Sequence, residues 1–257
     1  WNAKTFSGWE NELEKATILI NLAGKSVDCR YTKENKKQIL LSRIESTKIL
    51  NKAILNCKNP PKHWLNSSTA TIYRFSLDKQ MDEIKGEIGN DFSINVALSW
   101  EKAFFKTETP NTLKTALRTS IVLGKNGGAF IPLKTLAKTG FGGKQGKGNQ
   151  FVSWIHEEDF ANAVDFIIQK EISGVVNVVS PEPIRNSDFM HKLRKAVGFP
   201  FGIPVNIFLL KIGSFIIRTE AELVLKSRNV IPKRLLESGF KFKFENIDEA
   251  FKNLLSK

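Results

Sequence analysis

The chain of 257 residues is poor in cysteine and histidine, which build disulfide frameworks and most metal sites. It holds two cysteines, Cys29 and Cys57, and three histidines. The two cysteines lack the short spacing of metal ligands, and two are too few to cross-link a chain of this length. The sequence therefore predicts no metal site. Scarce cysteine is also typical of a reducing, cytoplasmic compartment.

Long hydrophobic runs are absent as well. The longest apolar stretch covers residues 199–217, and Asn206, Lys211 and Ser214 interrupt it. A membrane-spanning helix needs about 20 consecutive, mostly apolar residues. The stretch therefore predicts no membrane span and indicates buried or interface structure. The opening residues Trp1-Asn2-Ala3-Lys4 do not resemble the apolar core of a secretory signal.

Acidic residues are outnumbered by basic ones, 26 against 39, which gives a net charge of +13. Such an excess raises nucleic-acid binding as a hypothesis. The basic residues are scattered and mostly lysine, with no arginine-rich helix and no aromatic RNA-binding pattern. We therefore favour a solvated, lysine-rich surface over a nucleic-acid partner. A surface that attracts an anionic cofactor or substrate is the second interpretation.

The sequence does contain a regular alternation of short apolar strands and longer amphipathic helices. Strands are predicted at residues 17–22, 63–68, 113–123 and 175–179, and helices at 32–57, 92–107 and 160–168. This alternation predicts an α/β fold with a Rossmann-like, doubly wound parallel sheet. The pattern becomes mainly helical after Gly202. We therefore predict a main domain over 1–202 and a small, mostly helical C-terminal module over 203–257.

Small and hydroxyl-bearing residues follow the first two predicted strands. Leu22-Ala23-Gly24 ends the first strand, where small residues let a backbone approach a ligand closely. Ser67-Ser68-Thr69 ends the second strand and runs on to Tyr73. Hydroxyl groups can polarise a reacting oxygen. Both segments also have a purely structural interpretation, as a buried strand end and as hydroxyls that satisfy their own backbone.

Two other segments place cations where an anion could bind. Ser42-Arg43 lies on the long predicted helix, and a guanidinium offers a fixed fork of donors to phosphate. Gly146-Lys147-Gly148 combines a permissive backbone with a cation. A surface ion pair is the alternative for Arg43, and a plain surface loop is the alternative for the glycine-rich segment. His156 and Asp159, at the start of a predicted helix, indicate a cap or a structural hydrogen bond.

Separated segments together resemble one family. They are residues 18–24, 67–73, 118–129, 142–159 and 227–240, with Ser42-Arg43 and Trp100-Glu101. They are similar to the epimerase-like oxidoreductases of the extended short-chain dehydrogenase/reductase superfamily, in a subgroup with a small C-terminal domain. Some members have been labelled cell-division inhibitors of the SulA type. The resemblance implies NADP or NAD as cofactor and a small-molecule substrate whose identity the sequence does not give. A homodimer is a candidate assembly.

The resemblance also implies roles for particular residues. Thr69 would contact the reacting oxygen, with Tyr73 as a second candidate for proton donor. The implied cofactor contacts are Leu22, Ala23, Gly24, Ser42, Arg43, Ser67, Ser68, Glu101 and Val122. The implied substrate or anion contacts are Arg118, Gly146, Lys147, Gly148 and Gln150.

Two departures from the family pattern bear on function. No Gly-x-Gly-x-x-Gly turn, which holds a dinucleotide pyrophosphate, occurs before Thr17. We therefore expect a chain without the family's first βαβ unit, by truncation rather than natural loss, and weak binding of NAD or NADP. In addition, Ala97 and Glu101 stand where the standard Tyr-x-x-x-Lys pair of the superfamily belongs, and the resembled subgroup shares the Trp-Glu variant. Neither side chain can replace the proton-exchanging tyrosine or the cationic lysine.

Two functions stay open from the sequence. The first is NAD(P)-dependent oxidoreduction or epimerisation of a small carbonyl, alcohol or sugar-nucleotide-like substrate. The second is a non-catalytic protein that senses the cofactor or binds a partner, for example in cell division. The hydroxyl-rich segment around Thr69 favours the first, and the substitutions at Ala97 and Glu101 favour the second.

Overall fold

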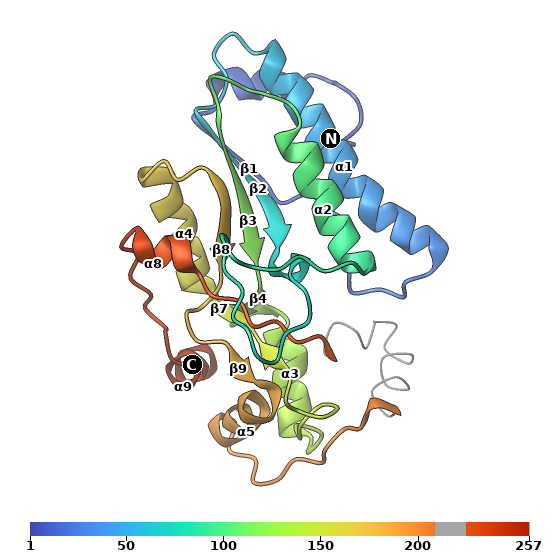
Figure 1. Cartoon of the computed structure of the whole chain (residues 1–257), viewed down its shortest axis with the longest axis vertical. Coiled ribbons are helices and arrows are strands. Elements are labelled where there is room, and N and C mark those ends of the chain that lie inside the picture. The colour runs from blue at the N-terminus through green and yellow to red at the C-terminus, as the bar shows by residue number, and fades with distance from the viewer. Residues whose placement is uncertain (209–224, 257) are drawn as a thin grey trace.

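A four-stranded parallel sheet organises the molecule (Figure 1). The computed structural model describes residues 1–208 and 225–256. The strands are β1 (Ile18–Asn21), β2 (His63–Thr69), β3 (Leu113–Thr119) and β8 (Gly174–Val178), in the order β1-β2-β3-β8. All three pairings are parallel, and the register joins Ile18 to His63 and His63 to Leu113. The predicted Rossmann-like α/β fold is confirmed.

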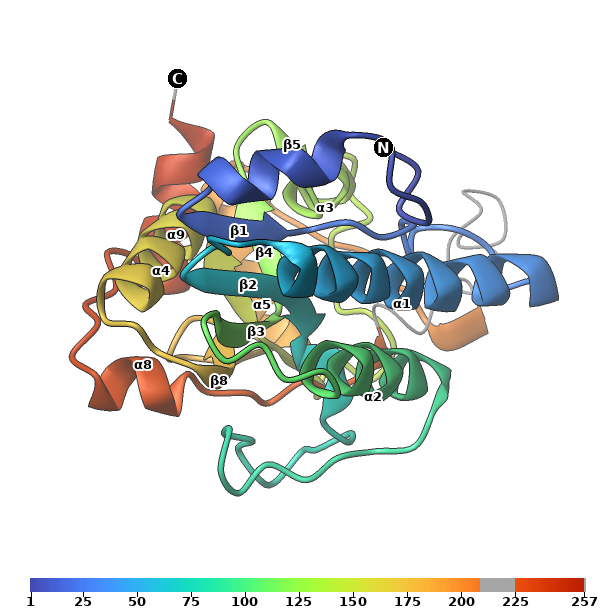
Figure 2. The same cartoon turned by 90° about the horizontal axis from the view of Figure 1, so that it is seen from above.

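Helices cover both faces of this sheet, as Figure 2 shows. Helices α1 (Lys33–Asn56) and α2 (Phe92–Phe105) lie on one face, and α4 (Glu157–Gln169) and α8 (Lys233–Glu237) lie on the other. Because side chains alternate along a strand, Trp64 packs with the first pair of helices and Leu65 with the second. The first two helices begin where the sequence predicts, with side-chain caps at Thr32 and Asp91.

A short 3₁₀ helix, η1 (Trp9–Lys15), precedes the sheet, and a second, η2 (Ala70–Ile72), follows β2. The sequence did not predict either. Leu13 of η1 is buried in the cluster that also holds Trp64 and Phe104. Residues near the start of the chain therefore contribute to the main core.

The predicted strand over residues 113–123 is wrong in one respect, because it divides at Ser120. β3 ends at Thr119, and β4 (Ile121–Gly124) belongs to a separate sheet with β5 (Gly127–Gly128) and β7 (Trp154–His156). Thr119 is the last residue of β3 that pairs with either β2 or β8. Beyond it the backbone finds new partners, and Ile121 pairs with Trp154.

A second hydrophobic core lies beside the small sheets. It joins α3 (Phe130–Lys138), α5 (Asn186–Ala196) and α9 (Ile247–Leu255), next to a two-stranded pairing of β6 (Phe151–Val152) with β9 (Ile184–Arg185). Phe189 and Phe251 meet edge to face in this core. It thus draws on both sides of position 202, and the division into 1–202 and 203–257 stays a prediction.

The apolar stretch after residue 199 is only partly described. Phe201, Ile203 and Phe208 are at least half exposed, so these three side chains are not buried within the chain, and the interface alternative stays a prediction. Residues 209–217 of the stretch lie outside the described residues. In the part of the chain that the structure describes, no helix has the length and apolar character to cross a membrane.

Candidate functional site at the carboxyl ends of β1 and β2

A cavity of about 320 Å³ opens at the carboxyl ends of β1 and β2, beside the N-terminal halves of α1 and α2. This is the edge at which open parallel sheets bind ligands. Six of the predicted site residues line it: Leu22, Gly24, Arg43, Ser67, Ser68 and Thr69. Residues from the turn after β1, from β2 and from α1, predicted separately, are therefore brought to one cavity.

Within the protein, the hydroxyl group of Thr69 acts as a hydrogen-bond acceptor, whereas that of Ser68 acts as a donor. Thr69 Oγ1 accepts a hydrogen bond from the backbone N–H of Thr71 at 3.1 Å, and no other described residue hydrogen-bonds to this hydroxyl. Its O–H hydrogen can therefore be donated into the cavity. Ser68 Oγ instead donates to Glu101 Oε1 at 2.6 Å, because a carboxylate only accepts. Thr69 thus offers a donor to a ligand, and Ser68 offers lone pairs.

Glu101 and Arg118 form a buried, bidentate ion pair beneath the cavity. Arg118 Nε donates to Glu101 Oε1 at 2.8 Å, and Nη2 donates to Oε2 at 2.7 Å. The two side chains are 11% and 10% exposed. Burial acts to lower the pKa of Arg118, but the hydrogen bonds and charge of Glu101 outweigh it and raise that pKa. Neither residue lines the cavity. The two charges therefore neutralise each other and are not presented to a ligand.

Tyr73 belongs to the same network. Its hydroxyl accepts from Arg118 Nη1 at 2.9 Å and donates to Asn177 Oδ1 at 2.9 Å. Its side chain is buried, and burial raises the pKa of the phenol even though Arg118 acts against this. The structure does not bring Tyr73 into the cavity. A role for it as proton donor stays a prediction with no geometric support.

Ala97, predicted from the sequence to stand at the position of the superfamily's tyrosine, is fully buried. It packs in a cluster with Ala70, Ile72 and Tyr73. The space beside Ala97 is therefore filled by neighbouring side chains. The departure seen in the sequence is built into the packing of α2.

Arg43 brings a positive charge to the cavity wall. Its Nη1 donates to the carbonyl oxygens of Lys25 and Ile39 at 3.0 and 2.9 Å, and its guanidinium lies 5.0 Å from the ring centre of Trp100. Desolvation lowers the pKa of Arg43, yet a guanidinium stays protonated in proteins. No carboxylate pairs with it among the described residues, so the surface ion pair is wrong. The charge remains available to an anion.

Gly24 is small for a reason that the sequence did not reveal. A Cβ atom at this position would lie 3.2 Å from Cζ of Arg43. The close approach is therefore to the guanidinium of Arg43 in the first place. Nearby, Ser42 Oγ accepts from the N–H of Lys25 at 2.9 Å, and Ala23 N–H donates to Asn21 Oδ1. These bonds fix the turn that follows β1.

Sequence reasoning missed the aromatic wall of the cavity. Tyr31 and Phe92 meet edge to face with ring centres 5.2 Å apart, and Trp100 adds a third ring. Tyr31 precedes the cap of α1, and Phe92 follows the cap of α2. Of these three residues, only Trp100 was singled out in the sequence, as part of the Trp100-Glu101 match to the family. The predicted starts of α1 and α2 were the one feature of the sequence that could have placed Tyr31 and Phe92 at the cavity.

Other predicted contacts lie elsewhere. Val122 packs in the core between β4 and α4. Gly146 and Gly148 adopt positive φ in an irregular loop, where Gly146 N–H donates to the carbonyl of Val205. Gln150 is buried and donates to the carbonyl of Gln145. Neither these residues nor the exposed Lys147 line the cavity.

His156 and Asp159 are structural, as predicted. His156 Nδ1 accepts from Glu158 N–H at the start of α4, and Asp159 accepts from the backbone N–H groups of Lys243 and Phe244. They tie α4 to the C-terminal part of the chain. Over residues 1–208 and 225–256, no group of three His, Cys, Asp or Glu side chains could hold a metal ion.

The parallel sheet and the cavity at its carboxyl edge define a Rossmann-like α/β protein. Its sequence is 32% identical over 251 residues to the epimerase family protein YfhF of Bacillus subtilis, covering 96% of this chain and 80% of that protein. It is 30% identical to the mouse epimerase family protein SDR39U1, covering 96% and 85%. The chain belongs to this epimerase family, which confirms the resemblance.

Solved structures agree with this assignment. The human epimerase family protein SDR39U1 (isoform 2) with NADPH superposes with a TM-score of 0.87 and 30% identity, over 95% of this chain and 85% of that one. A nucleoside-diphosphate sugar epimerase from Corynebacterium glutamicum gives a TM-score of 0.78 and 26% identity, over 99% and 49%. Residues 207–254 match a domain of unknown function, DUF1731.

Proposed function

We propose that the cavity at the ends of β1 and β2 takes the nicotinamide and ribose of NADPH or NAD. The chain would then catalyse oxidoreduction or epimerisation of a small carbonyl, alcohol or sugar-nucleotide-like substrate. The human relative was crystallised with NADPH. The hydroxyl-lined strand end, the small turn at Gly24 and the unpaired Arg43 suit a phosphorylated, hydroxyl-rich ligand. A bound nicotinamide supplies or accepts a hydride.

The observation that carries the proposal is the orientation of Thr69. Its O–H can be donated to the oxygen that alternates between carbonyl and alcohol, because its lone pair already accepts from Thr71. A threonine of ordinary acidity orients and polarises that oxygen, while water or the substrate supplies the proton. Ser68, fixed by Glu101, accepts a hydrogen bond from a hydroxyl or amide of the bound ligand. Arg43 attracts the negative charge of the ligand's phosphate groups.

A non-catalytic, cofactor-sensing protein is the second candidate, and one observation favours it. The place of the usual proton donor is filled by the packing around Ala97, and Glu101 is committed to Arg118. A protein with these features can retain the cofactor pocket without turnover.

One experiment separates the two candidates. Because the sequence predicts weak cofactor binding without the Gly-x-Gly-x-x-Gly turn, the chain is extended upstream to include that turn. This extended form is mixed with NADPH and a panel of small aldehydes, ketones and oxidised sugar nucleotides, and the absorbance of the reduced cofactor is followed. Consumption of NADPH that depends on one class of carbonyl supports catalysis. NADPH binding without consumption for any carbonyl supports the second candidate.

Cofactor binding itself is tested by calorimetry with Arg43→Gln in the same upstream-extended form. A lost charge-assisted hydrogen bond is worth roughly 1.5–3 kcal/mol, so NADPH should bind about tenfold more weakly or worse. Lys33→Gln, an exposed lysine on the same helix, removes one charge outside the cavity and should leave the affinity unchanged. Equal losses in both variants would exclude a specific role for Arg43.

A further inference from the structure

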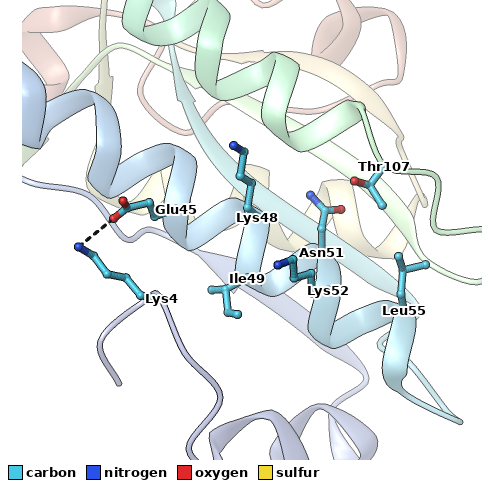
Figure 3. Close-up of a pocket in the computed structure, with 8 residues that line it drawn as sticks. All are labelled: Lys4, Glu45, Lys48, Ile49, Asn51, Lys52, Leu55 and Thr107. Carbon is cyan, nitrogen blue, oxygen red and sulfur yellow. Dashed lines mark ion pairs between the residues drawn. The ribbon is translucent and has the colours of Figure 1, made fainter.

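A second cavity, of about 360 Å³, lies on the outer face of the C-terminal half of α1 (Figure 3). The exposed Leu55, with the edge of the buried Ile49, gives it an apolar surface. Lys48, Asn51 and Lys52 come from the same helix, and Lys4 and Thr107 from flanking segments. It shares no lining residue with the cavity at the ends of β1 and β2. It is therefore a separate site, independent of the proposed function.

The charge around this cavity is positive and incompletely balanced. Lys48 and Lys52 are exposed and stand one helical turn apart, so their ammonium groups repel each other. Neither has a carboxylate partner among the described residues. The cavity's carboxylate, Glu45, pairs with Lys4 at 3.4 Å. Two unpaired cations thus remain beside the apolar surface.

A partly buried cation, Lys114, adds to the positive charge from behind the cavity. Lys114 Nζ donates to Asn51 Oδ1 and to the carbonyl oxygen of Thr107, both on residues that line the cavity, and to the carbonyl of Phe104. Its partners are neutral, and desolvation lowers the pKa of Lys114 to about 8. An anion in front of Asn51 would be attracted by Lys114 as well as by the two exposed lysines.

We propose that this cavity is a binding site for a small organic phosphate. The dianionic phosphate matches the two unpaired ammonium groups of Lys48 and Lys52, and the organic part rests on Ile49 and Leu55. The volume falls at the lower end of the range for small-molecule sites. This favours a compact monoester over an extended polymer.

The test uses phenyl phosphate, which has a compact ring and does not resemble a nucleotide. It is titrated into the whole chain by calorimetry at low ionic strength, because salt screens exposed charges. The double variant Lys48→Gln/Lys52→Gln should bind about tenfold more weakly, since each exposed ionic contact contributes about two- to fivefold. Lys33→Gln/Lys37→Gln is the matched control, with the same spacing, helix and charge change and both lysines exposed outside the cavity.

Unchanged affinity in the first double variant would overturn the proposal, as would equal losses in both double variants or no binding by the parent chain. Two further titrations test the parts of the site. Inorganic phosphate should bind more weakly than phenyl phosphate, and equal affinity would overturn the assignment of the organic part to Ile49 and Leu55. NADPH should leave the phenyl phosphate affinity unchanged, and competition would overturn a separate site.

Discussion

Two hydroxyl groups four residues apart, on Thr69 and Tyr73, are held in opposite ways. Thr69 keeps its O–H available at the mouth of a cavity, while Tyr73 has its hydroxyl bonded to both Arg118 and Asn177 inside the protein. The phenol is the stronger acid of the two by residue type, yet its hydrogen bonds and burial keep it away from the cavity. The difference shows that access and bonding, rather than residue type, decide which group can do chemistry.

The largest expected effect comes from breaking the network that holds Tyr73. Glu101→Ala removes one partner of a buried ion pair and leaves Arg118 without its carboxylate. Such a change typically costs about 3–5 kcal/mol of unfolding free energy. Denaturant unfolding measures it, with Glu108→Ala, an exposed carboxylate just beyond α2, as the control. A loss no larger than that of the control would mean that the pair does not stabilise the fold.

Thr69→Val addresses the accessible hydroxyl. The variant keeps the shape and deletes the O–H, so kcat should fall roughly 10²-fold, as for removal of one oxyanion donor. Its unfolding free energy should stay close to that of the parent chain, because only the backbone N–H of Thr71 loses a partner. Thr71→Val is the comparison, since that hydroxyl lines the same cavity but accepts from Arg228. Equal activity in Thr69→Val and the parent would refute the role given to Thr69.

Tyr73→Phe should show the reverse pattern. It leaves one N–H of Arg118 and the Oδ1 atom of Asn177 without a buried partner, which costs about 1–3 kcal/mol of stability. Turnover per folded molecule should change little. If Tyr73→Phe abolishes turnover while Thr69→Val is near normal, the two roles are inverted.

The smallest expected effect concerns His156, a buried group that, like Tyr73, is hydrogen-bonded inside the protein. Its titration should make the stability of the fold depend on pH. Burial lowers the pKa of His156, whose Nδ1 accepts from Glu158 and whose Nε2 bonds Asn253 Oδ1. The folded state therefore holds this imidazole neutral, and its contribution to stability is present above the unfolded pKa of about 6.5. As the pH falls below that value the unfolded chain takes up the proton first, so stability is lost.

The matched variant is His156→Asn, which keeps an acceptor for the helix cap without a titrating ring. Unfolding free energies are compared at about pH 7.5 and about pH 5, on either side of that pKa. The parent chain should lose more stability than the variant across this window. Burial also lowers the pKa of His63, which is present in both proteins and cancels in the comparison. Equal losses would contradict the assignment.

Local patterns predicted most of the main sheet and its helices. The apolar runs of β1 and β2 and the caps at Thr32 and Asp91 are properties of adjacent residues, and they could be recognised in the sequence. The division at Ser120 could not, because it depends on where β2 and β8 end. Periodicity along one segment carries no information about when its partners stop.

The candidate site likewise has a part that local sequence patterns predicted and a part that they could not. Thr69, Ser68 and Arg43 were singled out because each residue type at its position suits a ligand, and all three line the cavity. The pairing of Glu101 with Arg118 joins a helix to a strand, and no local spacing announces it. Each residue was therefore assigned to a ligand, although each is satisfied by the other.

The pairing of Glu101 with Arg118 also constrains how this protein can evolve. A lysine at position 101 would face the guanidinium of Arg118 and leave Ser68 without its acceptor. A tyrosine at position 97 would have to displace Ala70, Ile72 or Tyr73. A single substitution toward a Tyr-Lys pair at positions 97 and 101 is thus opposed by the residues around each position.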